Sequence, residues 1–216
     1  MKLNLKNIIN TLKDIRDYTF PIKRFTSKFK NINSKEDLKS FIQERSAHVT
    51  QSTLYGYIKT RIGSRYAMMF EDEVFSNSIN IAKWNIYMSA LSDLTIYVFS
   101  YLINKKNLKQ NDAEEIFITI VENENKKQKV ISATKITDKI FENAKIEFKQ
   151  RLKAIDWSKH HLDSPFKNSG LALYKWSPIA DELKILDKEI VLNSIKLKWN
   201  LIENEFKDLT KNLNFN

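Results

Sequence analysis

Apolar residues recur at intervals of three and four along most of the chain, the spacing that puts them on one face of an α-helix. One such stretch begins after Ser34, where Asp37 three positions on resembles a capping box. It is predicted to end near Ile62, with Gly63 as the C-cap. A second stretch covers Glu71–Ile103 and contains the most apolar part of the sequence. The pattern therefore predicts long helices in the middle of the chain.

The second half of the chain shows the same periodicity with interruptions. Residues 111–124 predict a short helix, residues 123–129 a polar linker, and residues 134–155 an amphipathic helix. Residues 156–175 contain a proline and a glycine and are predicted to be irregular. The last helix is predicted to start at Ser177–Pro178, with the serine as N-cap and the proline at the first helical position.

This last helix carries two apolar stripes. One comprises Ile179, Leu183, Leu186, Ile190, Leu197 and Leu201, and the other comprises Leu192, Ile195, Trp199, Ile202, Phe206 and Leu209. Two stripes predict burial on two sides, either inside a bundle or at a homo-oligomer interface formed by the 178–209 helix.

Turn-forming residues are scarce, since the 216 residues include three glycines and three prolines. Sandwiches, barrels and doubly wound sheets need many turns, so the predicted fold class is all-α. We expect one domain over 1–216, an irregular helical bundle with two or three long central helices. Gly56, Gly63 and Gly170 are too dispersed for a Gly-rich phosphate loop or a G-x-S-x-G elbow. The lack of cysteine excludes a disulfide framework and a cysteine nucleophile.

Positive charge is concentrated near the N-terminus. The net charge is +10, and the first 65 residues, with nine lysines, five arginines and five acids, contribute +9 of it. An AT-rich genome would inflate lysine, but five of the six arginines also lie in this third of the chain. A local excess of this kind favours an anionic partner, either a membrane surface or an acidic protein. Nucleic acid is less favoured, because no nucleic-acid-binding motif accompanies the charge.

Residues 1–30 form a basic amphipathic segment with eight basic and two acidic residues. Its helix either lies on an anionic membrane with Phe20, Phe25 and Phe29 inserted, or docks its apolar face on the bundle. Polar residues interrupt the N-terminus, which argues against a signal peptide, and residues 78–103 are too polar for an easy membrane span. The predicted location is cytoplasmic, either soluble or peripheral to the membrane.

Glu44, His48 and Ser52 are candidates for a catalytic triad. They stand at i, i+4 and i+8 on one predicted helix face, in the order acid, base, nucleophile. A straight helix spends its backbone N–H groups on its own hydrogen bonds and supplies no oxyanion hole there, so a polar helix face is the favoured interpretation.

A candidate anion-binding site surrounds Gly63. Lys59, Arg61, Ser64 and Arg65 place cationic groups beside a predicted helix N-terminus, which suits phosphate or carboxylate. The favoured alternative is that Arg61 and Arg65 pair internally with Glu71, Asp72 or Asp93. Asp93 lies in a segment rich in Ile, Leu, Tyr and Trp, so we predict a buried charge that needs a basic partner, Arg61 or Arg65.

Two further groups of polar residues have structural interpretations. Asp156, His160, His161 and Asp163 combine imidazole and carboxylate, but without a recognised metal-ligand spacing they favour a solvated loop over a metal site. The other carboxylates near predicted helix starts, Asp187 included, are predicted to be helix-start and surface charges. No metal or other cofactor is expected.

Several blocks of the sequence are distinctive. They are Lys59–Tyr66 (KTRIGSRY), Met69–Phe75 (MFEDEVF), Ser78–Trp84 (SINIAKW), Trp176–Asp181 (WSPIAD), Asp187–Val191 (DKEIV) and Asn193–Ile195 (NSI). Between about Ser46 and Trp199 the chain resembles a family of small bacterial all-helical proteins that often carry the label esterase. The resemblance implies a hydrolase and carries over no catalytic residue.

The function expected from the residues is that of a non-catalytic scaffold or adaptor. Its basic N-terminal third would dock on an anionic membrane surface or an acidic partner. A small esterase-like hydrolase, which the resemblance implies, and a nucleic-acid-binding protein are the alternatives.

Overall fold

The computed structural model describes Phe20, residues 28–66, 68–106, 108–131 and 135–211, and Leu213. This part of the chain consists of helices and connecting turns and contains no strand, which confirms the all-α fold class. The predicted N-terminal helix and most of the basic segment 1–30 lie outside the described residues.

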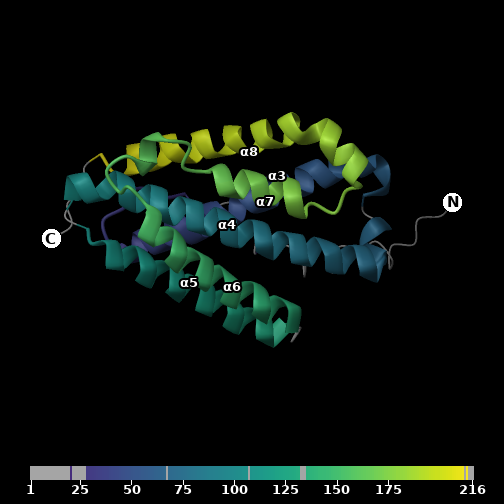
Figure 1. Ribbon diagram of the computed structural model, residues 1–216, viewed down its shortest axis with the longest axis horizontal. Helices are drawn as coiled ribbons and strands as arrows, with labels where there is room; N and C mark the ends of the chain where they lie inside the picture. Colours follow the sequence, from purple (N-terminus) through teal and green to yellow (C-terminus); the bar gives the residue numbers. More distant parts are fainter. Residues whose placement is uncertain are drawn as a thin grey trace.

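The described residues form six α-helices, and their packing is consistent with the predicted helical bundle. The α-helices are α3 (Lys35–Ile62), α4 (Glu73–Lys106), α5 (Gln110–Ile131), α6 (Lys135–Ala154), α7 (Lys167–Trp176) and α8 (Asp181–Leu209); short 3-10 turns form η1 (Gly63–Arg65), η2 (Met68–Glu71) and η3 (His160–Leu162). Figure 1 shows α8 along one long edge, the α5–α6 hairpin on the opposite side, and α4 between them.

Helix α4 is the axis of the bundle, because α3, α5, α6 and α7 all pack against it. The stretch Glu73–Ile103 is long and apolar enough to cross a membrane, yet 83% of its apolar window is buried among the other helices. The interpretation of this stretch as a central core helix is confirmed.

The start and end of α3 follow from two local signals that the sequence contains. Ser34 is the N-cap, and its hydroxyl accepts from the Asp37 N–H at 3.1 Å and donates to the Asp37 carboxylate at 2.8 Å. These bonds and a backbone bond from Asn33 lower the pKa of Asp37, the Asn33 bond most. Gly63 ends the helix with φ of 63°, a conformation that favours glycine.

The predicted polar linker at residues 123–129 is wrong, because α5 continues through it to Ile131. Its polar side chains are used inside the bundle: Glu124 is 3% exposed and accepts hydrogen bonds from Gln43 and Tyr87. Gln128, one turn further on, is also buried. A polar sequence can therefore remain helical where neighbouring helices satisfy it.

The predicted irregular region is wrong in its second half, where α7 forms. Gly170 marks close packing rather than a turn: a Cβ there would lie 3.3 Å from Leu192 and 3.6 Å from Ile195 of α8. Ser177 ends α7, since its N–H and hydroxyl both donate to the Leu173 carbonyl, and α8 begins only at Asp181 with Ala180 as N-cap. The predicted start of the last helix was therefore about three residues early.

Two arginines of α3 join it to α8 in antiparallel fashion. Arg45 forms a bidentate pair with Glu205, at 2.7 Å from Nε and 2.5 Å from Nη2. Four turns further along, Arg61 forms a bidentate pair with Asp187, which also accepts from the Tyr57 hydroxyl at 2.9 Å. Asp187 is 3% exposed, so its predicted place among the surface charges is wrong. Part of the arginine excess near the N-terminus thus holds the bundle together.

We expect Asp187→Ala to lower the free energy of unfolding by about 3–5 kcal/mol, because the partly buried guanidinium of Arg61 then has no counter-charge. Asp187→Asn should cost less, since an amide oxygen still accepts from Tyr57. Asp181→Ala, at an exposed position of the same helix, is the control and should change stability by about 0.5 kcal/mol or less. Urea denaturation measures all three. Equal losses for Asp187→Ala and Asp181→Ala would show that the pair does not stabilise the fold.

Candidate functional site

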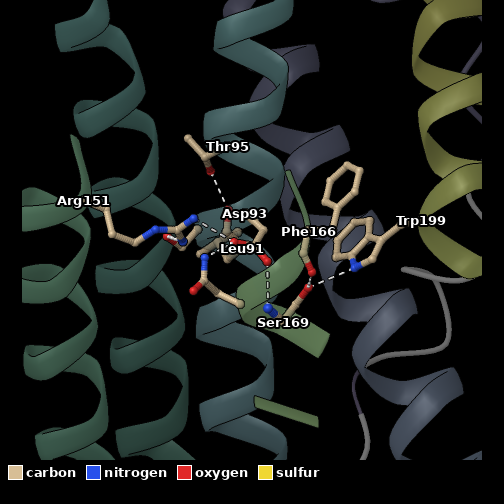
Figure 2. A network of polar contacts seen from close by, with 9 residues as sticks. Leu91, Asp93, Thr95, Arg151, Phe166, Ser169 and Trp199 are labelled. Carbon is tan, nitrogen blue, oxygen red and sulfur yellow. Dashed lines mark hydrogen bonds and ion pairs between the residues drawn. The ribbon is translucent and has the colours of Figure 1, made fainter. Parts of the chain in front are cut away.

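Asp93 lies at the centre of a polar network that joins three helices (Figure 2). Its side chain is fully buried on α4. One carboxylate oxygen accepts from Arg151 of α6 at 2.8 Å and from the Asn168 amide at 3.2 Å. The other accepts from the backbone N–H of Ser169 at 2.7 Å. Three donors from α6 and α7 are thereby fixed around one buried charge on α4.

The bond to Ser169 makes Asp93 a cap for α7 from a different helix. α7 begins at Lys167, and its N-cap residue, Phe166, offers no side-chain hydrogen bond. The N–H of Ser169 is one of the first-turn groups that lack a partner within the helix, and a carboxylate is favourable at that end of the helix dipole. The buried charge and the start of α7 therefore stabilise each other.

The same serine extends the network to α8. Ser169 Oγ donates to the Phe166 carbonyl at 3.0 Å and accepts from the indole N–H of Trp199 at 2.9 Å. The rings of Phe166 and Trp199 stack 4.4 Å apart. Figure 2 shows Trp199 approaching from the side of Ser169 opposite Arg151.

The prediction that Asp93 is buried and paired is confirmed, but its predicted partner is wrong. The partner is Arg151, the only arginine outside the basic N-terminal third. Arg61, one of the two predicted partners, pairs with Asp187 instead. Spacing along the chain indicated the preceding helix, whereas the fold places α6 beside this face of α4.

Arg151 also borders a groove of about 700 Å³ between α6 and α7, with α4 as its floor. Its apolar lining comes from all three helices: Ile81 and Met88 of α4, Ile140, Ala144 and Phe148 of α6, and Leu171, Ala172 and Trp176 of α7. Arg151, Ser92 and Asn168 line the end nearest Asp93. The buried charge lies behind this end and fixes the side chains that face the groove.

The opposite end of the groove is basic. Lys139 of α6 and Lys175 of α7 are exposed side chains in its lining. Lys175 lies over the ring of Trp176, with its ammonium nitrogen 5.2 Å from the ring centroid. Glu147 is the acidic residue of the lining. Cationic groups above an apolar floor suit a ligand that is both acidic and apolar.

Helix α4 carries a sequence signal for this groove. Asn85, Ser89 and Ser92 recur at i, i+4 and i+7 in the otherwise apolar α4, and all three line the groove. They are among the polar residues that make the stretch 78–103 too polar for an easy membrane span. A small polar stripe on a core helix also indicates a face that no neighbouring helix covers.

The triad candidates Glu44, His48 and Ser52 all lie on α3, as predicted. Ser52 Oγ donates to the Val49 carbonyl of its own helix at 3.3 Å, so its proton is directed away from a catalytic base. Burial lowers the pKa of His48, and Lys198 and Arg45 lower it further. The geometry fits a polar helix face beside α8, the interpretation that the sequence favoured.

The candidates for an anion-binding site do not have the same surroundings in the structure. Arg61 forms an ion pair with Asp187. It was correctly predicted to pair inside the protein, but the predicted partners, Glu71, Asp72 or Asp93, are wrong. Lys59 and Arg65 are exposed, and the Ser64 side chain is outside the described residues. η1, the turn at this point, has no side-chain cap and is too short to provide an anion-binding helix start.

The metal candidates Asp156, His160, His161 and Asp163 do not form a site. Among the residues that the structure describes, no three His, Asp or Glu side chains gather so that they could hold a metal ion. Asp156 instead accepts from the N–H and the hydroxyl of Ser158, at 3.0 and 2.6 Å, which closes a turn.

A serine–histidine contact occurs nearby, but it has a structural role. Ser100 Oγ donates to the Trp157 carbonyl at 2.9 Å, accepts from the His161 N–H at 3.0 Å and lies 3.0 Å from His161 Nδ1. Ser100 is fully buried, whereas a nucleophile must meet its substrate. These bonds hold the turn before α7 on α4.

Two of the three phenylalanines expected to insert into a membrane lie on the bundle. Phe20 is 4% exposed and packs edge-on to Trp84 at 5.5 Å, and its N–H donates to Gln51. Phe29 packs partly buried against Phe41. Phe25 is outside the described residues. At these two positions the docking alternative for the 1–30 segment is the correct one.

Comparison with protein-family models, with curated proteins and with solved structures found no match to this chain. The resemblance to an esterase-labelled family therefore stays a prediction.

We expect Asp93→Ala to lower the melting temperature sharply, equivalent to about 3–5 kcal/mol, because it leaves Arg151 without its counter-charge and removes the α7 cap. Asp93→Asn should cost less, since its amide oxygen still accepts from one donor. Differential scanning calorimetry measures both changes. A neutral Asp93→Ala would contradict the central role given to this carboxylate.

The lowered pKa values of two histidines predict that the protein loses stability in mild acid. Burial is the largest cause of the lowered pKa of His48 and of His160, with Arg151 contributing to the latter. As the pH falls, the unfolded chain therefore binds protons at these histidines before the folded chain does. The contribution of the neutral histidines to the free energy of unfolding is complete above about pH 6.5 and is lost as the pH drops below it. The melting temperature measured from pH 7.5 to 5.5 should decline, and the double variant His48→Gln/His160→Gln should decline less steeply. An unchanged slope in the variant would contradict this assignment.

Proposed function

We propose that this protein is a non-catalytic helical adaptor that binds an acidic, amphipathic helical segment of a partner protein in the groove between α6 and α7. The observation that carries the proposal is the groove itself, with an apolar floor on α4 and lysines of two helices at one end. The basic residues that this proposal uses are Lys139 and Lys175, and docking through the basic N-terminal third stays a prediction.

The dimensions of the groove favour a helix as its occupant. Along α4 the lining extends from Ile81 to Ser92, about 16 Å or three helical turns. The groove remains partly open, whereas sites for small molecules bury most of the ligand surface. An amphipathic helix laid into an apolar groove leaves its polar face in water, which suits an open site.

The charge of the lining favours an acidic occupant. Asp93 holds Arg151 in an ion pair, so the charge offered to a partner is concentrated at Lys139 and Lys175. An acidic residue of the partner at that end would meet both ammonium groups. The apolar side chains of the partner would cover Leu171 and Trp176 of α7, which are 44% and 37% exposed.

The test uses fluorescence anisotropy with a labelled synthetic peptide that has leucines at i, i+3, i+4 and i+7 and glutamates at one end. The same peptide with lysines in place of glutamates is the charge control. We expect the acidic peptide to bind more tightly and to weaken as salt is added. Lys139→Glu/Lys175→Glu should weaken its binding about tenfold or more, or about 1.4 kcal/mol.

The matched control variant is Lys126→Glu/Lys127→Glu, which makes the same charge change at exposed positions of α5. It should leave binding of the peptide nearly unchanged. Equal weakening by the two double variants would mean that net charge, not the groove, attracts the peptide, and would reject the proposal. Displacement of a fluorescent fatty acid from the groove, without peptide binding, would assign the site to a small anionic amphiphile instead.

A further inference from the structure

The outer face of α8 carries a row of exposed apolar side chains that the bundle does not cover. Five of them follow one stripe: Leu183, Leu186, Ile190, Leu197 and Leu201, with exposed fractions of 39%, 76%, 69%, 65% and 65%. The other apolar stripe of α8, which includes Ile195, Trp199 and Phe206, is buried in the core. Burial was predicted on two sides of α8, and the bundle buries one of them.

The stripe has the spacing of a helix–helix seam. Leu183, Leu186, Ile190, Asn193 and Leu197 succeed one another at alternating intervals of three and four residues. Asn200 and Asn204 continue the same row. The seam therefore contains no charged side chain over about 27 Å from residue 183 to residue 201. Apolar residues with an occasional asparagine are typical of packed helix pairs.

One pair of charges beside the seam is complementary to the same pair in a second copy turned end to end. Glu189 and Lys196 both lie exposed on the same edge, seven residues apart. In an antiparallel pair related by a two-fold axis, Glu189 faces the partner's Lys196 and Lys196 faces the partner's Glu189. The same register places Leu186 against the partner's Leu197. One sequence thus supplies both sides of the contact.

We propose that two copies of this chain associate through the outer faces of α8, in antiparallel orientation, to form a two-fold dimer. This inference goes beyond the adaptor function and does not depend on the groove. A single helix pair is a small interface, so we expect a dimer that dissociates on dilution. The groove lies between α6 and α7, away from the outer face of α8, so each copy keeps its own.

Sedimentation velocity over a concentration series tests the dimer with the full chain. We expect the mass to rise from that of one chain toward twice that value. Leu186→Glu should hold the protein monomeric, because it buries a charge in the seam. Leu162→Glu is the matched control: Leu162 lies outside α8 and is also 76% exposed, so it should leave association intact. Both variants should keep the melting temperature of the parent monomer.

Charge exchange tests the orientation. Glu189→Lys and Lys196→Glu should each weaken association about tenfold, since each creates two like-charge contacts across the axis. The double variant Glu189→Lys/Lys196→Glu should restore it. The antiparallel arrangement is wrong if Leu186→Glu abolishes the dimer but the double exchange associates no better than the two single charge variants. A chain that stays monomeric at every concentration, or binds vesicles through this face as a monomer, would overturn the dimer.

Discussion

A carboxylate without access to water needs a hydrogen-bond partner for each oxygen, and Asp93 creates this requirement at the middle of the central helix. Its partners come from α6 and from the first turn of α7, so the charge is satisfied only when both helices lie against α4. The positions of α6 and α7 follow from this condition. The groove between them is the space that remains when two helices meet the same residue from different sides.

The arginines show that part of the positive charge of a sequence forms ion pairs within the bundle and part lies on its surface. Arg45, Arg61 and Arg151 each pair with a carboxylate of another helix, and together these pairs connect α3 with α8 and α6 with α4. A planar guanidinium can meet a carboxylate with two parallel bonds, which explains why the two ties between α3 and α8 use arginine in a chain rich in lysine. Arg151 instead divides its donors between Asp93 and Ser92. Lysines lie on surfaces, including the basic end of the groove, although Lys83 of α4 is buried against Phe20 and Trp84. A count of basic residues therefore overstates the charge offered to partners.

Local signals in the sequence predicted much of the fold. Ser34 and Gly63 fix the ends of α3, because caps act within a few residues of the helix they end. The apolar character of α4 predicted its central place and the burial of Asp93. These features depend on neighbours along the chain or on composition, and both are visible in the sequence.

Features that depend on packing were not predicted. Gly170 indicated a loop, but it permits α7 to approach α8, and only the assembled pair distinguishes the two roles. Asp187, near the start of α8, resembles a surface acid until α3 brings Arg61 to it. The groove was missed for the same reason, since its lining comes from three helices. The partner of Asp93 was misassigned because the chain order of α3 and α4 does not reveal where α6 lies.

The ties between α3 and α8 have a consequence for synthesis of the chain on the ribosome. Arg45 and Arg61 are separated from Glu205 and Asp187 by 160 and 126 residues. At typical elongation rates α3 emerges on the order of ten seconds before α8. During that interval its arginines and the apolar side that α8 will cover remain in water. The nascent chain therefore passes through a stage in which its first long helix is complete in sequence but unfinished in structure, and a chaperone that recognises such surfaces would meet it there.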